Sequence, residues 1–136
     1  MNARHIAHIA LLVRDYDEAI AWYARALGFV VLEDSALDHG KRWVRMAPTR
    51  DASFSLLLAR ATTSEALACV GHQHGGRVGL FLHTDDFAGD HARLVAAGVA
   101  CETPPREEAH GTVVVFRDLY GNRWDLIQPR ARVTAP

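Results

Sequence analysis

Apolar and polar positions follow one pattern that occurs twice along the chain. Residues 8–13 alternate between two faces, and apolar residues at helical spacing follow as far as Gly28. The same order recurs 71 residues later, starting at Gly79 and ending at Gly98. Each copy predicts a strand, an acidic helix cap, an amphipathic helix and a glycine that ends the helix. A repeat of this length that occurs only twice indicates two copies of one supersecondary module rather than a solenoid.

Three further strands are predicted in each module. The strands expected are residues 5–13, 29–35, 41–47 and 53–59 in the first module, and 77–84, 99–102, 111–117 and 123–128 in the second. Between the modules, residues 60–76 predict a flexible connector that contains a short helix capped by Thr62 or Thr63. A loose tail is expected at 129–136.

These elements predict an α+β fold. Two βαβββ modules, residues 5–59 and 77–128, would share one domain of 136 residues. We expect their eight strands to form one cupped, mostly antiparallel sheet with the helices outside. In the first helix, the spacing predicts a buried stripe of Tyr16, Ile20, Tyr23 and Leu27. Such a cup can enclose a small-molecule cavity, with the His8 face lining it.

The composition narrows the class of protein. The formal net charge is −1 and the sequence pI about 6.7, whereas nucleic-acid-binding domains usually carry a basic stripe. The two cysteines, Cys69 and Cys101, are far apart, which favours a reducing compartment over a disulfide scaffold. There is no apolar run of the roughly 20 residues that a spanning helix needs, and the start does not resemble a signal peptide. We therefore expect a cytoplasmic protein with no nucleic-acid or membrane partner.

Two residues are candidates for chemistry because they lie on strands that are otherwise apolar. His8 opens the first strand, where a lone histidine is more often a satisfied core residue than a ligand. Asp125 lies in an apolar strand, where an unpaired carboxylate is costly to bury. It requires a cation, a donor or solvent, and a structural arginine is about as plausible as a metal.

The remaining candidates would line the cup. His83 shares a strand face with Phe81 and Gly79, so it could act as a ligand, a general base or part of the wall. His110 precedes a strand and could reach the mouth of the cavity. The strand aromatics Trp43, Phe81 and Trp124 are cavity walls or core residues. By contrast, we expect His72 and His74, among glycines, to be solvated, and His91 to pack in the core.

Several motifs resemble the vicinal oxygen chelate superfamily, which includes glyoxalase I, extradiol dioxygenases and bleomycin-sequestering proteins. The stretch from His8 to Tyr23, closing with Leu27-Gly28-Phe29, resembles the opening of that family. The stretches Ala96-Ala97-Gly98-Val99 and Phe116 to Leu126 resemble its closing module. The resemblance covers residues 5–128 and implies the glyoxalase/dioxygenase-like fold. It also implies a homodimer, because members of this length commonly pair.

In the metal-dependent members, the ligands come from the first and last strands of each module. The resemblance places His8 and Asp125 at two of these four positions. The other two fall on Gly79, which has no side chain, and on the stretch 54–58, which has no carboxylate, Gln or His. Asp125 also stands where the family usually has the longer Glu.

The resemblance leads to two main hypotheses. The first, favoured by how common enzymes are in the family, is a metal-dependent lyase or dioxygenase. In it, His8 and Asp125 would hold Fe, Mn, Ni or Zn as a Lewis acid, and His83 would carry protons. The alternative is a metal-free protein that sequesters a small molecule. Its ligand would lie between Trp43, Phe81 and Trp124, oriented by Asp125, Arg45 and His83. A silent scaffold ranks last.

Overall fold

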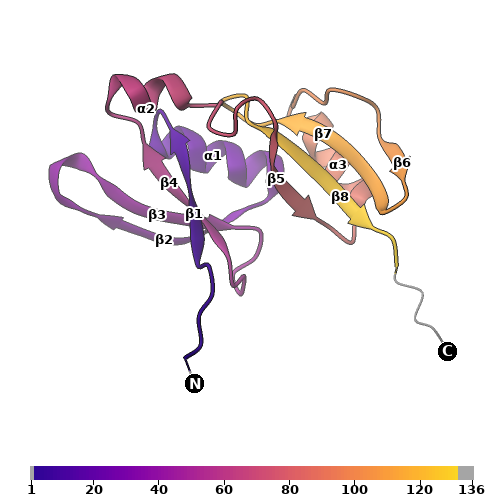
Figure 1. Cartoon of the computed structure of the whole chain (residues 1–136), viewed down its shortest axis with the longest axis horizontal. Helices are drawn as coiled ribbons and strands as arrows, with labels where there is room; N and C mark the ends of the chain where they lie inside the picture. Colours follow the sequence, from indigo (N-terminus) through magenta and orange to yellow (C-terminus); the bar gives the residue numbers. More distant parts are fainter. Residues whose placement is uncertain (1, 132–136) are drawn as a thin grey trace. The chain divides into compact units, whose positions relative to one another are not determined.

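The computed structural model describes residues 2–131 and divides into two compact units. Unit 1 comprises Met1–Gln73 and unit 2 comprises His74–Pro136. The boundary falls within the predicted connector, so each predicted module lies in one unit (Figure 1). The outer part of the predicted tail, residues 132–136, lies outside the described residues.

Unit 1 contains a four-stranded sheet with the order β1-β4-β3-β2. Its strands are β1 (His8–Val13), β2 (Val30–Ala36), β3 (Arg42–Ala47) and β4 (Ser55–Arg60). Strands β1 and β4 are parallel, and the other two pairs are antiparallel. Helix α1 (Tyr16–Leu27) connects β1 to β2, and the short helix α2 (Ser64–Cys69) follows β4.

Helix α1 forms where the sequence supplies a cap at each end. The Asp15 carboxylate accepts a hydrogen bond of 2.7 Å from the backbone N–H of Glu18, and Gly28 ends the helix with a φ of 68°. The buried residues of α1 are Tyr16, Ala19, Trp22, Tyr23 and Ala26. The predicted stripe was therefore right for the two tyrosines, but Ile20 and Leu27 are only partly buried because the small alanines lie closest to the sheet.

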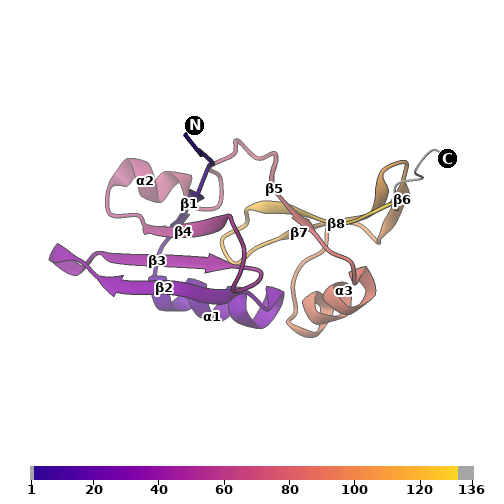
Figure 2. The same ribbon diagram turned by 90° about the horizontal axis from the view of Figure 1, so that it is seen from below.

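The two faces of the unit 1 sheet differ in cover. Helix α1 packs against β3 and β4, and the buried Leu11, Val44 and Leu58 lie on the face beneath it (Figure 2). The opposite face carries His8, which is paired in register with Ser55, together with Arg45. We call this second face the open face of unit 1.

Unit 2 repeats the topology with the order β5-β8-β7-β6. Its elements are β5 (Val78–His83), α3 (Phe87–Ala96), β6 (Arg106–Glu108), β7 (Gly111–Arg117) and β8 (Arg123–Pro129). Strands β5 and β8 are parallel, and the remaining pairs are antiparallel. Asp86 caps α3 by accepting from the N–H of Gly89 at 3.1 Å, and Phe87 and Leu94 are the buried residues of this helix.

One predicted strand of unit 2 was wrong. The stretch 99–102 forms only an isolated bridge between Cys101 and Phe116, and β6 begins after the two prolines. Proline cannot donate to a ladder, so Pro104 and Pro105 interrupt the pairing, which resumes at Arg106. The fold class was confirmed as α+β with two βαβββ modules. In the described residues the eight strands form two separate four-stranded sheets instead of one continuous sheet.

The turn between β7 and β8 is built around a buried carboxylate. Asp118 is 6% exposed, and its Oδ1 accepts from the backbone N–H groups of Tyr120, Gly121 and Asn122 at 2.9–3.1 Å. Its Oδ2 accepts from the side chains of Asn122 and Trp124. The motif Asp118 to Asn122 therefore serves the fold of this turn. No helix within residues 2–131 has the length and apolar character needed to cross a membrane.

Candidate ligand-binding site

The open face of unit 1 carries an aromatic side chain held in one orientation. The rings of His8 and Trp43 meet edge to face, with centroids 5.4 Å apart and planes at 83°. The indole N–H of Trp43 donates to Oε1 of Glu33 at 3.1 Å. Both rings are partly buried, and the two contacts fix the edge of the indole. The same face of the sheet also carries the exposed Ala10.

Glu33 links the indole to a cation. Its Oε1 also accepts from Nε of Arg45 at 2.8 Å, and Nη1 of Arg45 donates to the hydroxyl of the buried Ser55 at 3.3 Å. The hydrogen bond from Arg45 is the largest cause that lowers the pKa of the Glu33 carboxyl below its ordinary value, and Trp43 and the charge of His8 act in the same direction. This open face thus presents a carboxylate, a guanidinium and an indole that are already connected to one another.

The free edge of β1 is covered by a side-chain amide from the predicted connector. Gln73 accepts from the N–H of Leu12 at 2.9 Å and donates to the carbonyl of Ala10 at 3.0 Å. The amide thereby makes the hydrogen bonds that the backbone of a neighbouring strand would otherwise make to β1. The connector is therefore anchored here by specific contacts, although the sequence predicted flexibility.

The face of the unit 2 sheet that carries Phe81 and Asp125, here called the open face of unit 2, has a different character. Phe81 on β5 is 59% exposed and pairs in register with Asp125 on β8. Oδ1 of Asp125 is buried and has no hydrogen-bond partner among the described residues. Burial raises the pKa of the Asp125 carboxyl, while the charges of Arg106, Arg123 and His110 oppose the rise. Arg123 is itself engaged by Glu102 at 2.7 and 2.8 Å, which leaves Asp125 short of a donor.

A histidine occupies the space above Gly79. A Cβ added at Gly79 would lie 2.2 Å from Cγ of His74, so the imidazole packs directly on the glycine. His74 is partly buried, which corrects the prediction that it is solvated. The missing side chain at residue 79 therefore leaves room for an imidazole that arrives from five residues earlier in the chain.

The other predicted site residues fall in several places. Trp124 lies in the core of unit 2, 3% exposed and stacked on Phe116, so this predicted ligand wall was wrong. It faces away from Asp125 because neighbouring strand residues point to opposite sides. His83 is exposed and pairs in register with Ile127, and His110 is exposed in the turn between β6 and β7. His91 is partly buried and stacks on Phe87 within α3.

Among the described residues, neither unit supplies a metal donor set. On the open face of unit 1, the β4 neighbours of β1 are Ser55, Leu57 and Ala59, so His8 gains no ligating partner from that strand. The other expected ligand, Asp125, belongs to unit 2. Within residues 2–131 there is no group of three or more His, Cys, Asp or Glu side chains that could hold a metal ion. Three or more protein ligands are usual for Fe, Mn, Ni or Zn.

Three contributors to these faces were missed from the sequence. Glu33, Gln73 and His74 make the contacts described above, but none lies on an apolar strand face where a polar residue attracts notice. The alternation of β2 gave no signal for Glu33, because the register shift between Val31 and Glu33 is what pairs it with Arg45. No local pattern marks Gln73 or His74, since their partners lie on strands elsewhere in the chain.

Comparison with known proteins identifies the family. Residues 5–126 match the model of the Glyoxalase/Bleomycin resistance protein/Dioxygenase superfamily. This range takes in both βαβββ modules, and the chain belongs to that superfamily. The resemblance noted in the sequence is thereby confirmed.

Individual relatives match over almost their full length. An uncharacterised protein of Shewanella frigidimarina is 51% identical over 124 residues, which cover 90% of this chain and 92% of the relative. The crystal structure of UcmS2 is similar with a TM-score of 0.78 and 28% identity, covering 93% of this chain and 98% of its own. TnmS3, an antibiotic-binding protein from Streptomyces sp. CB03234, has a TM-score of 0.75 and 33% identity, covering 96% and 99%.

Proposed function

We propose that this chain is a metal-independent binding protein that sequesters a small planar aromatic compound. The observation that carries the proposal is the Trp43 indole on the open face of unit 1, fixed at its edge by His8 and Glu33. The 33% identity to an antibiotic-binding protein supports a binding role. The same function was the alternative hypothesis from the sequence.

The chemistry of the open face suits such a ligand. An aromatic ring gains from offset stacking on an indole, and a wall that is already ordered loses little side-chain entropy when the ligand binds. Arg45 and Glu33 lie beside the indole and can orient polar substituents of the ligand. We assign Trp43 the stacking role and Arg45 the orienting role.

A metal-dependent reaction receives less support from the residues present. His8 packs its ring on Trp43, and the strand next to it contributes serine, leucine and alanine instead of a second ligand. A Lewis-acid mechanism needs an ion held in an open coordination site, and neither unit groups three suitable donors within the described residues. We therefore place the binding role ahead of the enzymatic one.

The experiment is calorimetric titration of the full chain in the presence of EDTA. The probes are metal-free bleomycin, chosen from the name of the superfamily, and doxorubicin, a planar polycyclic antibiotic. We expect saturable binding of at least one probe. Removing the stacking wall in Trp43→Ala should weaken it about 30-fold, or about 2 kcal/mol, the scale of an aromatic hot spot.

Phe54→Ala is the matched control, because Phe54 is a 44% exposed aromatic of unit 1 next to β4. It should bind like the wild type. Equal affinity of Trp43→Ala and the wild type would contradict the proposal. Binding that appears only after Fe, Mn, Ni or Zn is added would favour the metal-dependent hypothesis instead.

A further inference from the structure

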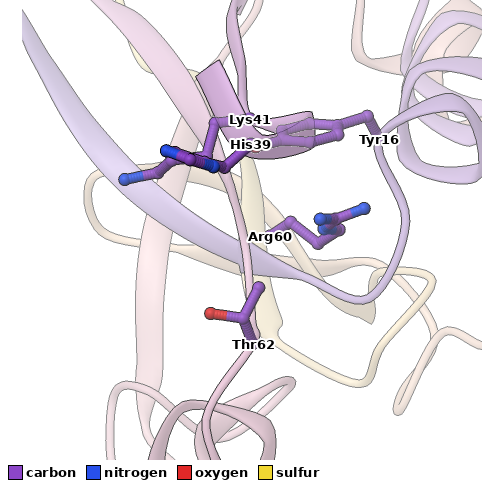
Figure 3. Close-up of a pocket in the computed structure, with 5 residues that line it drawn as sticks. All are labelled: Tyr16, His39, Lys41, Arg60 and Thr62. Atoms are coloured by element: carbon purple, nitrogen blue, oxygen red, sulfur yellow. The ribbon is translucent and has the colours of Figure 1, made fainter. Parts of the chain in front are cut away.

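A separate cavity of unit 1 is lined by residues that the open face does not use. It has a volume of about 320 Å³. Its lining residues are Tyr16, His39, Lys41, Arg60 and Thr62 (Figure 3). They come from the first turn of α1, the tip of the β2–β3 hairpin, the end of β4 and the segment after it. The cavity is therefore built by three stretches that are distant in sequence, around residues 16, 39–41 and 60–62.

The lining is basic and contains no carboxylate. Lysine, arginine and histidine contribute three nitrogen-bearing side chains, and Thr62 contributes a hydroxyl. Within the described part of the chain, no carboxylate forms an ion pair with Lys41 or Arg60. Two cations without an ion-pair partner thus line one cavity, and an anion bound there would interact favourably with both.

A neighbouring arginine in this part of the fold has its positive charge compensated by carboxylates. Arg42 also lies over the Tyr16 ring, at 5.2 Å, but its guanidinium is paired with Asp17 at 2.9 Å and Asp34 at 2.7 Å. Those carboxylates are thus engaged by Arg42. The positive charge that remains at the cavity belongs to Arg60 and Lys41.

The guanidinium of Arg60 is held in place without an acidic partner. It lies 5.8 Å from the centre of the Tyr16 ring, and a Cβ added at Gly40 would be 3.6 Å from its Nη2. The ring and the hairpin tip therefore support it on two sides. In the view of Figure 3, the guanidinium of Arg60 lies below the Tyr16 ring, His39 and Lys41 lie beside that ring, and Thr62 lies farther down.

The hairpin tip has a backbone conformation that positions two of the basic residues. His39 has a φ of 62° and Gly40 a φ of 76°, so the chain reverses tightly between β2 and β3. The N–H of Lys41 closes the turn on the carbonyl of Asp38 at 3.2 Å. A left-handed conformation is uncommon for a residue with a side chain, and here it places His39 beside Lys41 at the cavity.

From these observations we infer that this cavity is a binding site for a phosphate-type dianion carried by a small organic molecule. The planar fork of Arg60 suits two oxygens of a phosphate, Lys41 adds a point charge, and Thr62 adds a hydroxyl donor. The cavity is larger than a phosphate group alone requires, which leaves room for the organic part. This site is distinct from the proposed aromatic-binding face.

The test is an NMR titration of the ¹⁵N-labelled full chain at constant ionic strength. The two probes are inorganic phosphate and phenyl phosphate. We expect saturable shifts of the amides of Tyr16, Lys41 and Thr62, with phenyl phosphate binding more tightly. Arg60→Gln should weaken the affinity for both probes about tenfold, the loss expected for a charge-assisted fork. Lys41→Gln should weaken it several-fold.

Arg50→Gln is the control, because Arg50 is an exposed arginine of unit 1 outside the cavity. It removes the same charge and should leave both affinities unchanged. Shifts that do not saturate, or equal losses in Arg60→Gln and Arg50→Gln, would overturn the site. Tighter binding of inorganic phosphate than of phenyl phosphate would overturn the organic ligand. Circular dichroism establishes that Arg60→Gln folds, and Lys41→Gln tests the same site without altering the contact to Tyr16.

Discussion

The sheets that carry the two open faces have the same topology, but their polar side chains differ in whether they find hydrogen-bond partners. In unit 1, Glu33, Arg45 and the indole N–H of Trp43 satisfy one another on the sheet. In unit 2, Oδ1 of Asp125 is buried without a partner among the described residues, and its register neighbour is the exposed Phe81. A duplicated scaffold therefore does not require duplicated chemistry, because side chains on the open face can change while the face under the helix keeps its core.

The first strands show the same divergence. His8 opens β1 and packs on Trp43, whereas the corresponding Gly79 of β5 is covered by the imidazole of His74. In unit 1 the imidazole belongs to a residue of the strand, whereas in unit 2 it belongs to a residue of the segment that precedes the strand. Variants at these positions test the differences between the two units, and the variant with the largest expected effect comes first.

The largest effect is expected at the turn between β7 and β8 of unit 2. The corresponding connection of unit 1, between β3 and β4, is an exposed loop. Asp118→Ala removes a buried acceptor and leaves the N–H groups of Tyr120, Gly121 and Asn122 without it. Hydrogen bonds to a charged group contribute about 1.5–3 kcal/mol each and are not additive, so we expect a loss of at least about 3 kcal/mol. Urea unfolding followed by circular dichroism measures it.

Asp51→Ala is the corresponding control in unit 1, since Asp51 is exposed in the loop between β3 and β4. It should change the free energy of unfolding by less than about 0.5 kcal/mol. Similar losses in the two variants would show that the buried carboxylate is not what stabilises the turn.

The next effect concerns the space above Gly79. In Gly79→Ala the new Cβ would overlap the His74 ring, which must then move. Inserting a group into a filled space typically costs about 1–3 kcal/mol, and we expect the lower end because a side chain can rotate away. Thermal unfolding measures the loss. The double variant Gly79→Ala/His74→Ala should recover most of it, and no recovery would contradict the packing of His74 on Gly79.

Asp125 should destabilise unit 2 at neutral pH. Because burial raises the pKa of its carboxyl in the folded state, ionisation favours unfolding, and stability falls as the pH rises through that pKa. Asp125→Asn should therefore be more stable than the wild type at pH 7, with the difference vanishing below the ordinary pKa of an aspartate. Urea unfolding across that pH range measures the change. Equal stability of Asp125→Asn and the wild type at pH 7 would contradict the cost assigned to the buried carboxylate.

The smallest effect is expected at Glu33. Its carboxyl pKa is lowered chiefly by the hydrogen bond from Arg45, so the stability it contributes is present above the unfolded-state pKa and is lost as the pH falls through the folded one. In Arg45→Gln, the pKa of Glu33 should return toward its ordinary value. A ¹³C NMR titration of the Glu33 carboxyl measures the pKa directly. An unchanged pKa in this variant would contradict the assigned cause.

The described structure also shows which parts of the chain can be predicted from local pattern. The strands β1 and β7 and an acidic cap for each of α1 and α3 were predicted, because each depends on residues a few positions apart. The predicted strand at 99–102 was wrong, since pairing there competes with two prolines and a partner strand that follows later in the chain. The sequence left Trp124 open as a core residue or a cavity wall, because the face of β8 that is covered depends on where α3 packs.

The two modules, the order of their elements and their family are evident from the sequence, since periodicity, caps and turn residues are local properties. Which polar residues meet is set by how the chain folds. Glu33 joins Trp43 and Arg45, Gln73 covers the edge of β1, and the Arg60 guanidinium lies over the Tyr16 ring. These contacts depend on strand register and on the packing of distant segments, and no spacing along the chain encodes either in a form that can be seen locally.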